Sequence, residues 1–210
     1  MDGERSTGRD SPKSRRTRAR ILDAAMRLFA EVGYHASGPA QIAEAAGLTR
    51  GAMLYHFPTR EALVEGAIEH IQAARLRLFD AAAGEANPDG DATSQAIVAY
   101  WRLLSEPPFL AFAELQSVAR TDPMVRARIA EAEAAFDRVQ VGEPFHALAQ
   151  AGPGPRFQAS RDLARFLLEG LSRASLAYDR DARIGNLLAV VDRAVRMLNR
   201  KGAVHDLWPD

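Results

Sequence analysis

The most informative part of the chain is residues 39–58, which read PAQIAEAAGLTRGAMLYHFP. Helical segments over 39–46 and 50–56 flank Gly47, a residue that suits the left-handed backbone at a helix end. Ala43 is small enough for two steeply crossed helices to approach each other. Three apolar residues are spaced to form a small core beneath them: Ile42, Leu48 and Met53. This spacing predicts a helix-turn-helix.

The second helix of such a motif enters the major groove of DNA with its N-terminal residues at the base edges. Arg50, Gly51 and Ala52 would occupy that end. Arg50 can reach a guanine edge or a phosphate, and Gly51 allows close approach of the backbone. Thr49 can cap the helix and donate a hydrogen bond to a phosphate. The spacing alone is equally compatible with a pair of packed helices that binds no DNA.

A longer pattern includes this stretch and extends to both sides of it. Its residues are Gly33-Tyr34, Ser37, Ile42-Ala43, Ala46-Gly47-Leu48-Thr49-Arg50-Gly51, Tyr55-His56-Phe57 and Arg60-Glu61-Ala62-Leu63. In this register, residues 15–65 resemble the TetR family of transcriptional regulators. Leu54 departs from the pattern, since the family commonly has an aromatic residue there. Gly38-Pro39, at the start of the first short helix, is a second departure.

The resemblance implies roles for individual residues. Ser37, Tyr55 and Arg60 would contact phosphates, which position the module on DNA without reading its sequence. His56 would lie near the DNA backbone. Three residues would face the groove: Arg50, Ala52 and Met53. Two arginines from a basic run near the N-terminus, Arg16 and Arg18, complete the set. The candidate DNA-binding residues are Arg16, Arg18, Ser37, Thr49, Arg50, Gly51, Ala52, Tyr55, His56 and Arg60.

Several of these residues have structural alternatives. Tyr55 and Phe57 could belong to the core, and His56 could pack against or cap a helix. The basic run from Lys13 to Arg20 contains no acidic residue, and it could be a solvated helix face or a phosphate clamp. Beside the motif, we favour the clamp for one or two of its residues.

Helical periodicity predicts an all-α fold of about nine helices, because no segment alternates with a period of two over more than a few residues. The expected helices cover about 13–32, 39–46, 50–56, 60–83, 91–105, 109–120, 123–150, 160–178 and 181–200. Ser37 is expected to cap the second of them, and Pro107-Pro108 to break the chain. We predict a flexible arm over 1–12, a DNA-binding domain over 13–60, and an effector-binding and dimerisation domain over 61–210.

The resemblance also implies an effector pocket enclosed by the fifth to seventh helices and the end of the fourth. Candidate lining residues are Tyr100, Trp101, Phe109, Phe112, Glu114, Gln116, Arg120 and Phe136. Glu114 or Arg120 would be a polar anchor in a pocket for an unidentified, largely apolar small molecule. The alternative is that aromatic residues at helical spacing form plain core.

Two apolar stripes near the C-terminus predict a four-helix interface between two copies of the chain. The candidate interface residues are Leu163, Leu167, Gly170, Leu171, Ala174, Ile184, Leu188, Val191 and Val195. Such a homodimer would present two recognition helices to a palindromic operator in double-stranded DNA. The alternative is that both stripes are buried within one monomer.

Net charge is zero, with 27 basic and 27 acidic residues, but residues 5–20 carry seven basic residues against one acid. This polarisation suits a DNA-binding end on a more acidic body. The absence of cysteine and of any long apolar run favours a cytoplasmic protein without a membrane span.

We expect no enzyme activity, metal or cofactor. Gly170–Ala174 only approaches a nucleophile elbow and lies within a helix, and Glu143 and His146 lack the further carboxylates of a di-iron site. The sequence therefore predicts a ligand-responsive repressor. The alternative is a small-molecule-binding helical module of the same fold without specific DNA binding.

Overall fold

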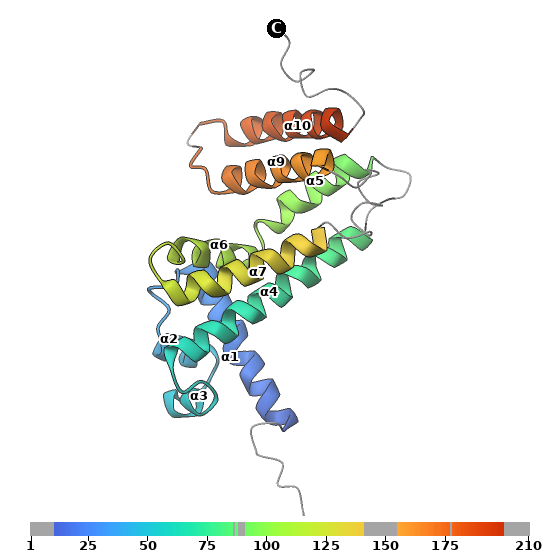
Figure 1. The fold of residues 1–210 in the computed structure, drawn as a ribbon. Helices are drawn as coiled ribbons and strands as arrows, with labels where there is room; N and C mark the ends of the chain where they lie inside the picture. Colours follow the sequence, from blue (N-terminus) through green and yellow to red (C-terminus); the bar gives the residue numbers. More distant parts are fainter. Residues whose placement is uncertain (1–10, 86, 88–90, 141–154, 177, 200–210) are drawn as a thin grey trace, which may run out of the picture. The chain divides into compact units, whose positions relative to one another are not determined.

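The computed structural model describes residues 11–85, 87, 91–140, 155–176 and 178–199 (Figure 1). This part of the chain contains nine α-helices and no strand, so the predicted all-α fold is confirmed. The helices are α1 (Pro12–Glu31), α2 (Pro39–Ala45), α3 (Arg50–His56), α4 (Arg60–Gly84), α5 (Ala92–Leu103), α6 (Pro107–Val118), α7 (Pro123–Gln140), α9 (Pro155–Ser172) and α10 (Arg180–Asn199). None of these described helices is both long and apolar enough to cross a bilayer.

Local signals explain where α1 begins and ends. Ser11 caps the helix by accepting a hydrogen bond from the Ser14 N–H at 3.2 Å. Pro12 follows in the first turn, where its missing N–H costs nothing. Gly33 has a φ of +88° and ends the helix in a conformation that side chains disfavour. The predicted boundaries differ from these by one residue, and the predicted arm lies almost wholly outside the described residues.

Other predicted boundaries need correction. Gly38, not Ser37, is the N-cap of α2, and it provides no side-chain hydrogen bond. The proline pair at 107–108 starts α6 instead of only preceding it, since proline fits the first helical turn. α9 starts at Pro155 and ends at Ser172, which shifts the predicted segment of 160–178 toward the N-terminus. The described part of α7 ends at Gln140, and the rest of the predicted 123–150 helix lies outside the described residues.

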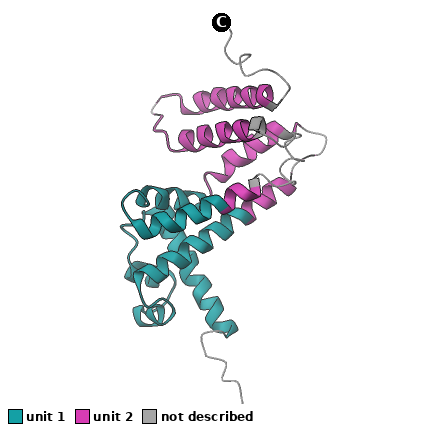
Figure 2. Ribbon diagram, in the orientation of Figure 1, with its two compact units in different colours: residues 1–76, 107–134 teal, residues 77–106, 135–210 magenta. Residues whose placement is uncertain are grey.

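The chain divides into two compact units (Figure 2). Unit 1 comprises residues 1–76 and 107–134, and unit 2 comprises residues 77–106 and 135–210. The domain boundary predicted near residue 60 falls inside unit 1, at the start of α4. The helix-turn-helix therefore shares a compact unit with most of α4, with α6 and with most of α7. The functional division at residue 60 stays a prediction.

The core of unit 1 joins the helix-turn-helix to α4 and α6. α1 packs along α6, and the buried side chains come from both helices. The contributors from α1 and α6 are Ile21, Ala24, Ala25, Phe29, Ala111, Phe112, Leu115 and Val118. α4 adds Leu63, Val64, Ala67, Ile68 and Ile71 to the same cluster. Because burial of apolar area is the main stabilising contribution, α1 is stabilised by helices far away in the sequence.

In unit 2, α9 and α10 pack side by side and both contact α5. Tyr100 on α5 donates its hydroxyl to Glu169 on α9 at 2.8 Å. Arg165, with 7% of its surface exposed, pairs with Glu169 at 3.0 Å and also with Asp137. Burial acts to lower the pKa of Arg165, but Glu169, Tyr100 and Asp137 together raise it, and the net shift is upward. These carboxylates satisfy a buried charge that would otherwise be costly.

Candidate nucleic-acid interface

The α2–α3 segment has the predicted helix-turn-helix geometry. Gly47 has a φ of +64°, and the Leu48 N–H donates to the Ala43 carbonyl at 2.9 Å, which closes the turn. Ile42 and Ala43 are buried at 1% and 2% exposure, so the small residue lies where α2 meets the core. Local sequence was sufficient here because a left-handed glycine and a small helix contact are short-range requirements.

The N-terminal end of α3 presents an open polar surface. Arg50, Gly51 and Ala52 are exposed, and a Cβ placed on Gly51 would meet no atom within 4 Å. Thr49 caps the helix, because its Oγ1 accepts the Ala52 N–H at 3.2 Å. A hydroxyl that accepts at a cap keeps its own proton to donate. Thr49 can therefore cap α3 and donate to a phosphate at the same time.

The remainder of α3 separates into buried and exposed residues. Met53 is 1% exposed and belongs to the core, so the expectation that it faces the groove is wrong, whereas its expected core position is confirmed. Phe57 is also 1% exposed, which confirms the structural alternative for this residue. Leu54 and Tyr55 are exposed at 37% and 53%. Tyr55 is thus available on the surface and is not a core residue.

Two arginines of the basic run hold the motif together. The Arg18 Nη1 donates to the carbonyl of His56 at 2.8 Å, and its guanidinium lies 4.2 Å from the centre of the Phe57 ring. The Arg20 Nη2 donates to the carbonyl of Ala46 at 2.5 Å. Both carbonyls are at helix C-termini, where a cation satisfies an orphan acceptor and the helix dipole. These two side chains clamp α3 and α2 to α1.

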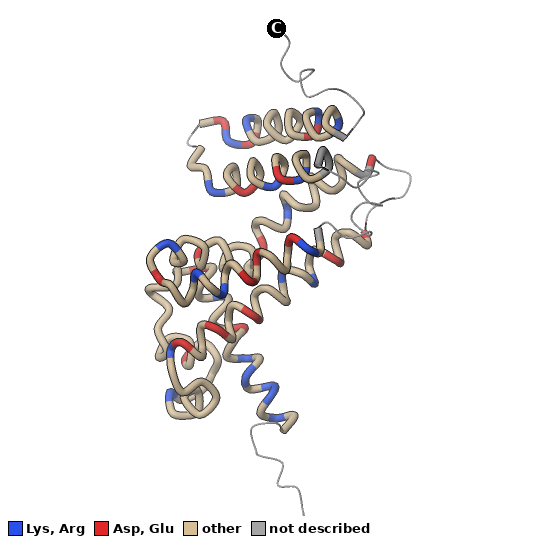
Figure 3. The backbone as a smooth tube through the Cα atoms, viewed as in Figure 1, with Lys and Arg blue, Asp and Glu red and all other residues tan. Residues whose placement is uncertain are grey.

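The other basic residues of the run lie exposed along the first half of α1: Lys13, Arg15 and Arg16. Figure 3 shows basic positions gathered on this part of the helix. His56 lies at the end of α3, and burial together with the charge of Arg18 lowers its pKa. His56 is therefore biased toward its neutral form.

Ser37 and Arg60 lie around the turn that joins α1 to α2. Ser37 is 3% exposed and donates its hydroxyl to the Gly33 carbonyl at 2.6 Å. A serine has one hydroxyl proton, so donation to a phosphate requires release of the Gly33 carbonyl. Arg60, at the start of α4, is exposed and lies 4.8 Å from the centre of the Tyr34 ring.

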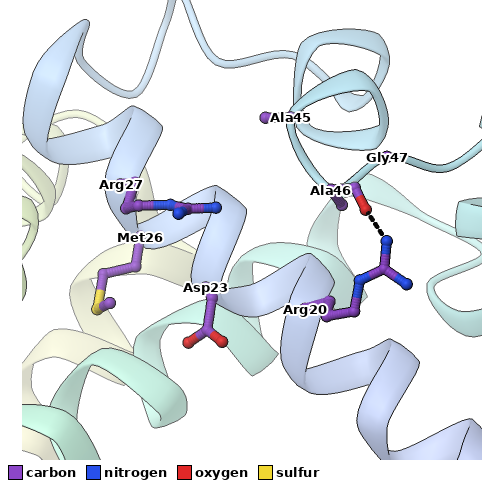
Figure 4. Close-up of a pocket in the computed structure, with 7 residues that line it drawn as sticks. All are labelled: Arg20, Asp23, Met26, Arg27, Ala45, Ala46 and Gly47. Carbon is purple, nitrogen blue, oxygen red and sulfur yellow. Dashed lines mark hydrogen bonds between the residues drawn. The ribbon is translucent and has the colours of Figure 1, made fainter.

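A shallow pocket of about 490 Å³ lies between α1 and the C-terminal end of α2 (Figure 4). Its lining residues are Arg20, Asp23, Met26, Arg27, Ala45, Ala46 and Gly47. The sequence does not predict this pocket, because its residues come from two helices whose packing is a tertiary property. The pocket is formed where Arg20 reaches across to the Ala46 carbonyl.

The candidate effector residues fall in both units. Five are in unit 1 and three in unit 2. Those in unit 1 are Phe109, Phe112, Glu114, Gln116 and Arg120, and those in unit 2 are Tyr100, Trp101 and Phe136. Their effector role stays a prediction.

Several of these candidates make defined contacts within their own unit. Phe112 and Phe109 lie beneath the Arg75 guanidinium, at 3.7 Å and 5.1 Å from their ring centres. Gln116 donates to Glu133 on α7 at 2.7 Å. Phe136 packs against Phe79 with ring centres 5.4 Å apart, inside unit 2. Phe109, Phe112 and Phe136 are thus buried, packed side chains, and Trp101 is half-buried.

The candidate dimer residues divide according to burial. Ile184, Val191 and Val195 are buried at 7%, 2% and 7% exposure in a single chain. They have little surface left to offer a partner, so we remove them from the candidate interface. Leu163, Leu171 and Leu188 are half-buried, and Leu167, Gly170 and Ala174 are exposed. Three further apolar residues on α9 and α10 are exposed as well: Phe166, Leu187 and Val190.

Metal binding and nucleophilic catalysis each require particular polar side chains to lie close together. In the described part of the chain, no three His, Asp or Glu side chains are placed to share a metal ion. Glu143 and His146 lie outside that part. Ser172 is the last residue of α9 and donates its hydroxyl to the Glu169 carbonyl at 2.8 Å. It does not lie on the strand-to-helix turn that a nucleophile elbow requires.

Comparisons with known proteins match the N-terminal segment most specifically. The family profile described as "Bacterial regulatory proteins, tetR family" matches residues 21–67. The HTH-type transcriptional regulator TtgR of Pseudomonas putida is 35% identical over 81 residues, which cover 39% of each chain. The match therefore spans about two fifths of that relative's length.

Two solved structures share the fold over most of the chain. Salmonella enterica GusR superposes with a TM-score of 0.67 at 21% identity, covering 91% of this chain and 99% of GusR. The multidrug binding protein EbrR, solved in complex with imidazole, has a TM-score of 0.60 at 19% identity, covering 90% and 98%. At these identities the likeness establishes the fold alone.

Proposed function

We propose that this chain, whose residues 21–67 match the TetR family of bacterial regulatory proteins, is a DNA-binding transcriptional regulator controlled by a small molecule. It acts as a repressor that binds a palindromic operator as a homodimer. The observation that carries the proposal is the open N-terminal end of α3 together with an exposed basic stretch of α1, which Arg18 joins to the C-terminal end of α3.

Base readout is assigned to the start of α3. Arg50 is exposed at the first position of the helix, and Gly51 and Ala52 beside it present no bulk. An arginine in this place can donate two hydrogen bonds to a guanine in the major groove, which discriminates against the wrong base by about 1–3 kcal/mol. Small neighbours allow the backbone to approach the base edges closely.

Phosphate binding is assigned to a set of exposed donors around α3. Lys13, Arg15 and Arg16 lie on α1, and Tyr55 and Arg60 lie at the other end of the motif. Such contacts set orientation and most of the salt-dependent affinity. Arg18 has a smaller part in this proposal, because its guanidinium already binds the His56 carbonyl and covers Phe57.

Dimerisation is assigned to the outer face of α9 and α10. Phe166 and Val190 are exposed at 63% and 62%, and Leu167 and Leu187 at 44% and 39%. Large apolar side chains gathered on neighbouring helices are a common mark of a protein interface. Two copies that pair through this face would form the four-helix arrangement that the sequence predicts.

Among the elements of the proposed function, control by a small molecule depends most on the similarity to proteins of known structure. EbrR is described as a multidrug binding protein and was solved with imidazole, which supports an effector for a chain with the same fold. The effector of this chain would be a largely apolar molecule that contacts residues among the eight candidates. It must bind the released conformation more tightly than the DNA-bound one to act as an inducer.

The test is selection of duplexes from a random-sequence pool by the purified full chain, followed by affinity measurements at several salt concentrations. The proposal predicts enrichment of a palindromic sequence, and binding that weakens steeply with salt. Binding that is absent, or equal for enriched and scrambled duplexes, would favour the alternative of a small-molecule-binding module. Arg50→Ala on the enriched duplex then tests the assigned reading residue.

A further inference from the structure

One side chain of α6 reaches the turn between α1 and α2. The Glu114 Oε1 accepts the backbone N–H of Tyr34 at 2.9 Å, across 80 residues of sequence. The same oxygen lies only 3.1 Å from the place where a Cβ at position 33 would be. Gly33, with a φ of +88°, therefore both makes the turn and leaves room for the carboxylate. A hydrogen bond to a charged acceptor is stronger than one between neutral groups.

Tyr34 is a junction between four helices of unit 1. Its ring packs on Phe29 of α1 with centres 5.5 Å apart, and the guanidinium of Arg60 on α4 lies over it at 4.8 Å. Its carbonyl accepts the Ser37 N–H at 3.2 Å, just before α2. Its own N–H is held by Glu114 on α6. The position of this residue thus influences where α2 and the start of α4 lie.

Ser37 and one proposed phosphate contact, Arg60, depend on the same turn. Ser37 is held through its backbone by Tyr34, and through its hydroxyl by the Gly33 carbonyl at 2.6 Å. Arg60 rests on the Tyr34 ring. Donors that bind phosphates must be placed accurately, because misplacement loses hydrogen bonds that are short and directional. A change in the turn would move Arg60 and the start of α2 together.

Glu114 is held firmly enough to fix the turn. It lies on the part of α6 that packs along α1, between the buried residues Phe112 and Leu115, at 2% and 0% exposure. A side chain on a well-packed helix has a defined starting point, so its reach to the Tyr34 N–H is preorganised. Tyr34 itself is 5% exposed, and water has limited access to replace the carboxylate.

We propose that Glu114 is a positioning residue of the DNA interface: its carboxylate fixes the α1–α2 turn and thereby places Arg60, which lies over the Tyr34 ring, for phosphate binding. The inference rests on the proposed DNA-binding function and deepens it. Glu114 touches no DNA itself. This role differs from the polar effector anchor that the family resemblance implies for Glu114, because its Oε1 is used by the turn. α6 is consequently connected to the DNA-binding surface by a specific hydrogen bond as well as by apolar packing.

The test compares three variants of Glu114 in the full chain with a matched control. Glu114→Ala removes the acceptor, Glu114→Asp withdraws it by one methylene while keeping the charge, and Glu114→Gln keeps a carbonyl acceptor at the same reach. The control is Glu133→Ala, since Glu133 is also half-buried and also accepts one hydrogen bond from another helix, from Gln116 at 2.7 Å. All are measured on a duplex that the unmodified protein enriches from a random pool, at a temperature where circular dichroism shows each protein folded.

We expect Glu114→Ala and Glu114→Asp to bind this duplex about tenfold more weakly, the effect of losing one charge-assisted hydrogen bond. Glu114→Gln should recover most of the affinity, and Glu133→Ala should bind as the unmodified protein does. Amide hydrogen exchange provides a direct readout of the turn. The Tyr34 amide should exchange faster in the Ala and Asp variants and remain protected in the Gln variant. A role limited to overall stability would lower the melting temperature without a selective change at Tyr34.

Three outcomes would overturn the inference. The first is unchanged duplex affinity in Glu114→Ala, and the second is an equal loss in Glu133→Ala. The third is Tyr34 amide protection that is the same in all variants. If the unmodified protein enriches no duplex, the proposed function fails and the inference falls with it. That failure is recognised from the unmodified protein alone, before any variant is made. If Glu114→Ala does not fold, the Asp and Gln pair decides the matter.

Discussion

Val190 and Val191 are neighbours on α10 with opposite environments, and this contrast gives a sharp test of the proposed dimer surface. Val190 is 62% exposed and Val191 is 2% exposed in the single chain. We predict that Val190→Asp dissociates the dimer and leaves the fold of each protomer intact. Val191→Ala should do the reverse and weaken the fold without altering assembly.

The size of the effect follows from the exposed fraction of Val190. Burying a whole valine side chain contributes about 1.5–3 kcal/mol, so the exposed portion is worth about 1–2 kcal/mol in each protomer. A two-fold symmetric interface contains both copies, which gives about 2–4 kcal/mol per dimer. Since about 1.4 kcal/mol is a factor of ten in affinity, the dissociation constant should rise by roughly 30- to 700-fold. The cost of burying two carboxylates adds to this figure.

The assay is sedimentation equilibrium or light scattering over a dilution series. The protomer mass is 22.9 kDa, and the unmodified protein should show twice that mass where Val190→Asp shows the protomer alone. Val190→Ala is the conservative control and should weaken association only slightly. Val191→Ala should lower the free energy of unfolding by about 1–3 kcal/mol, from lost methyl burial and the cavity left behind.

A dimer of unchanged dissociation constant in Val190→Asp would refute the assignment of this face. Dissociation of Val191→Ala with no loss of stability would show that the opposite face of α10 is the interface. Both results are readable from mass and unfolding data on the same samples.

Three further predictions concern unit 1. Arg50→Ala should weaken binding to the enriched duplex more than to a scrambled one, whereas Arg60→Ala should weaken both alike and reduce the salt slope by about one; equal losses from Arg50→Ala on the two duplexes would contradict base readout. Gly47→Ala should destabilise the fold by about 1–2 kcal/mol in urea denaturation, because alanine is strained at a φ of +64°; a variant as stable as the original would contradict the strain. The pKa of His56 is lowered in the folded state by burial and by Arg18, so the unfolded chain takes up the proton first and stability falls as the pH drops below the ordinary histidine range, about 6.5. His56→Gln should flatten this part of the curve of unfolding free energy against pH, and an unchanged curve would exclude His56 as its source.

Short-range features of the fold could be predicted from the sequence. Gly47 ends α2, Thr49 caps α3 and Gly33 ends α1, and each depends on backbone conformation or on a hydrogen bond within a few residues. The all-α fold follows from apolar periodicity, which is also local. Where local signals compete, the prediction was wrong: Ser37 has the chemistry of a cap, but the preceding turn engages its hydroxyl.

The roles of individual site residues required the packed structure. A basic run indicates a DNA-facing helix, but it does not distinguish an arginine that binds phosphate from one that binds the end of a neighbouring helix. Arg18 and Arg20 are of the second kind, because α1 lies against the C-termini of α3 and α2. Glu114 likewise lies 80 residues from its partner, and no spacing rule in the sequence connects the two.

The sequence by itself therefore determined the helices, the turn of the helix-turn-helix and the family resemblance, because these depend on neighbours along the chain. Only the tertiary structure decided which side of each helix is buried. Periodicity identifies an apolar stripe but not whether it is buried within one chain or against a partner, and the structure buries Ile184, Val191 and Val195 within one chain. The physical reason is that burial and long-range hydrogen bonds depend on which helix packs against which, and this is set by the whole chain at once.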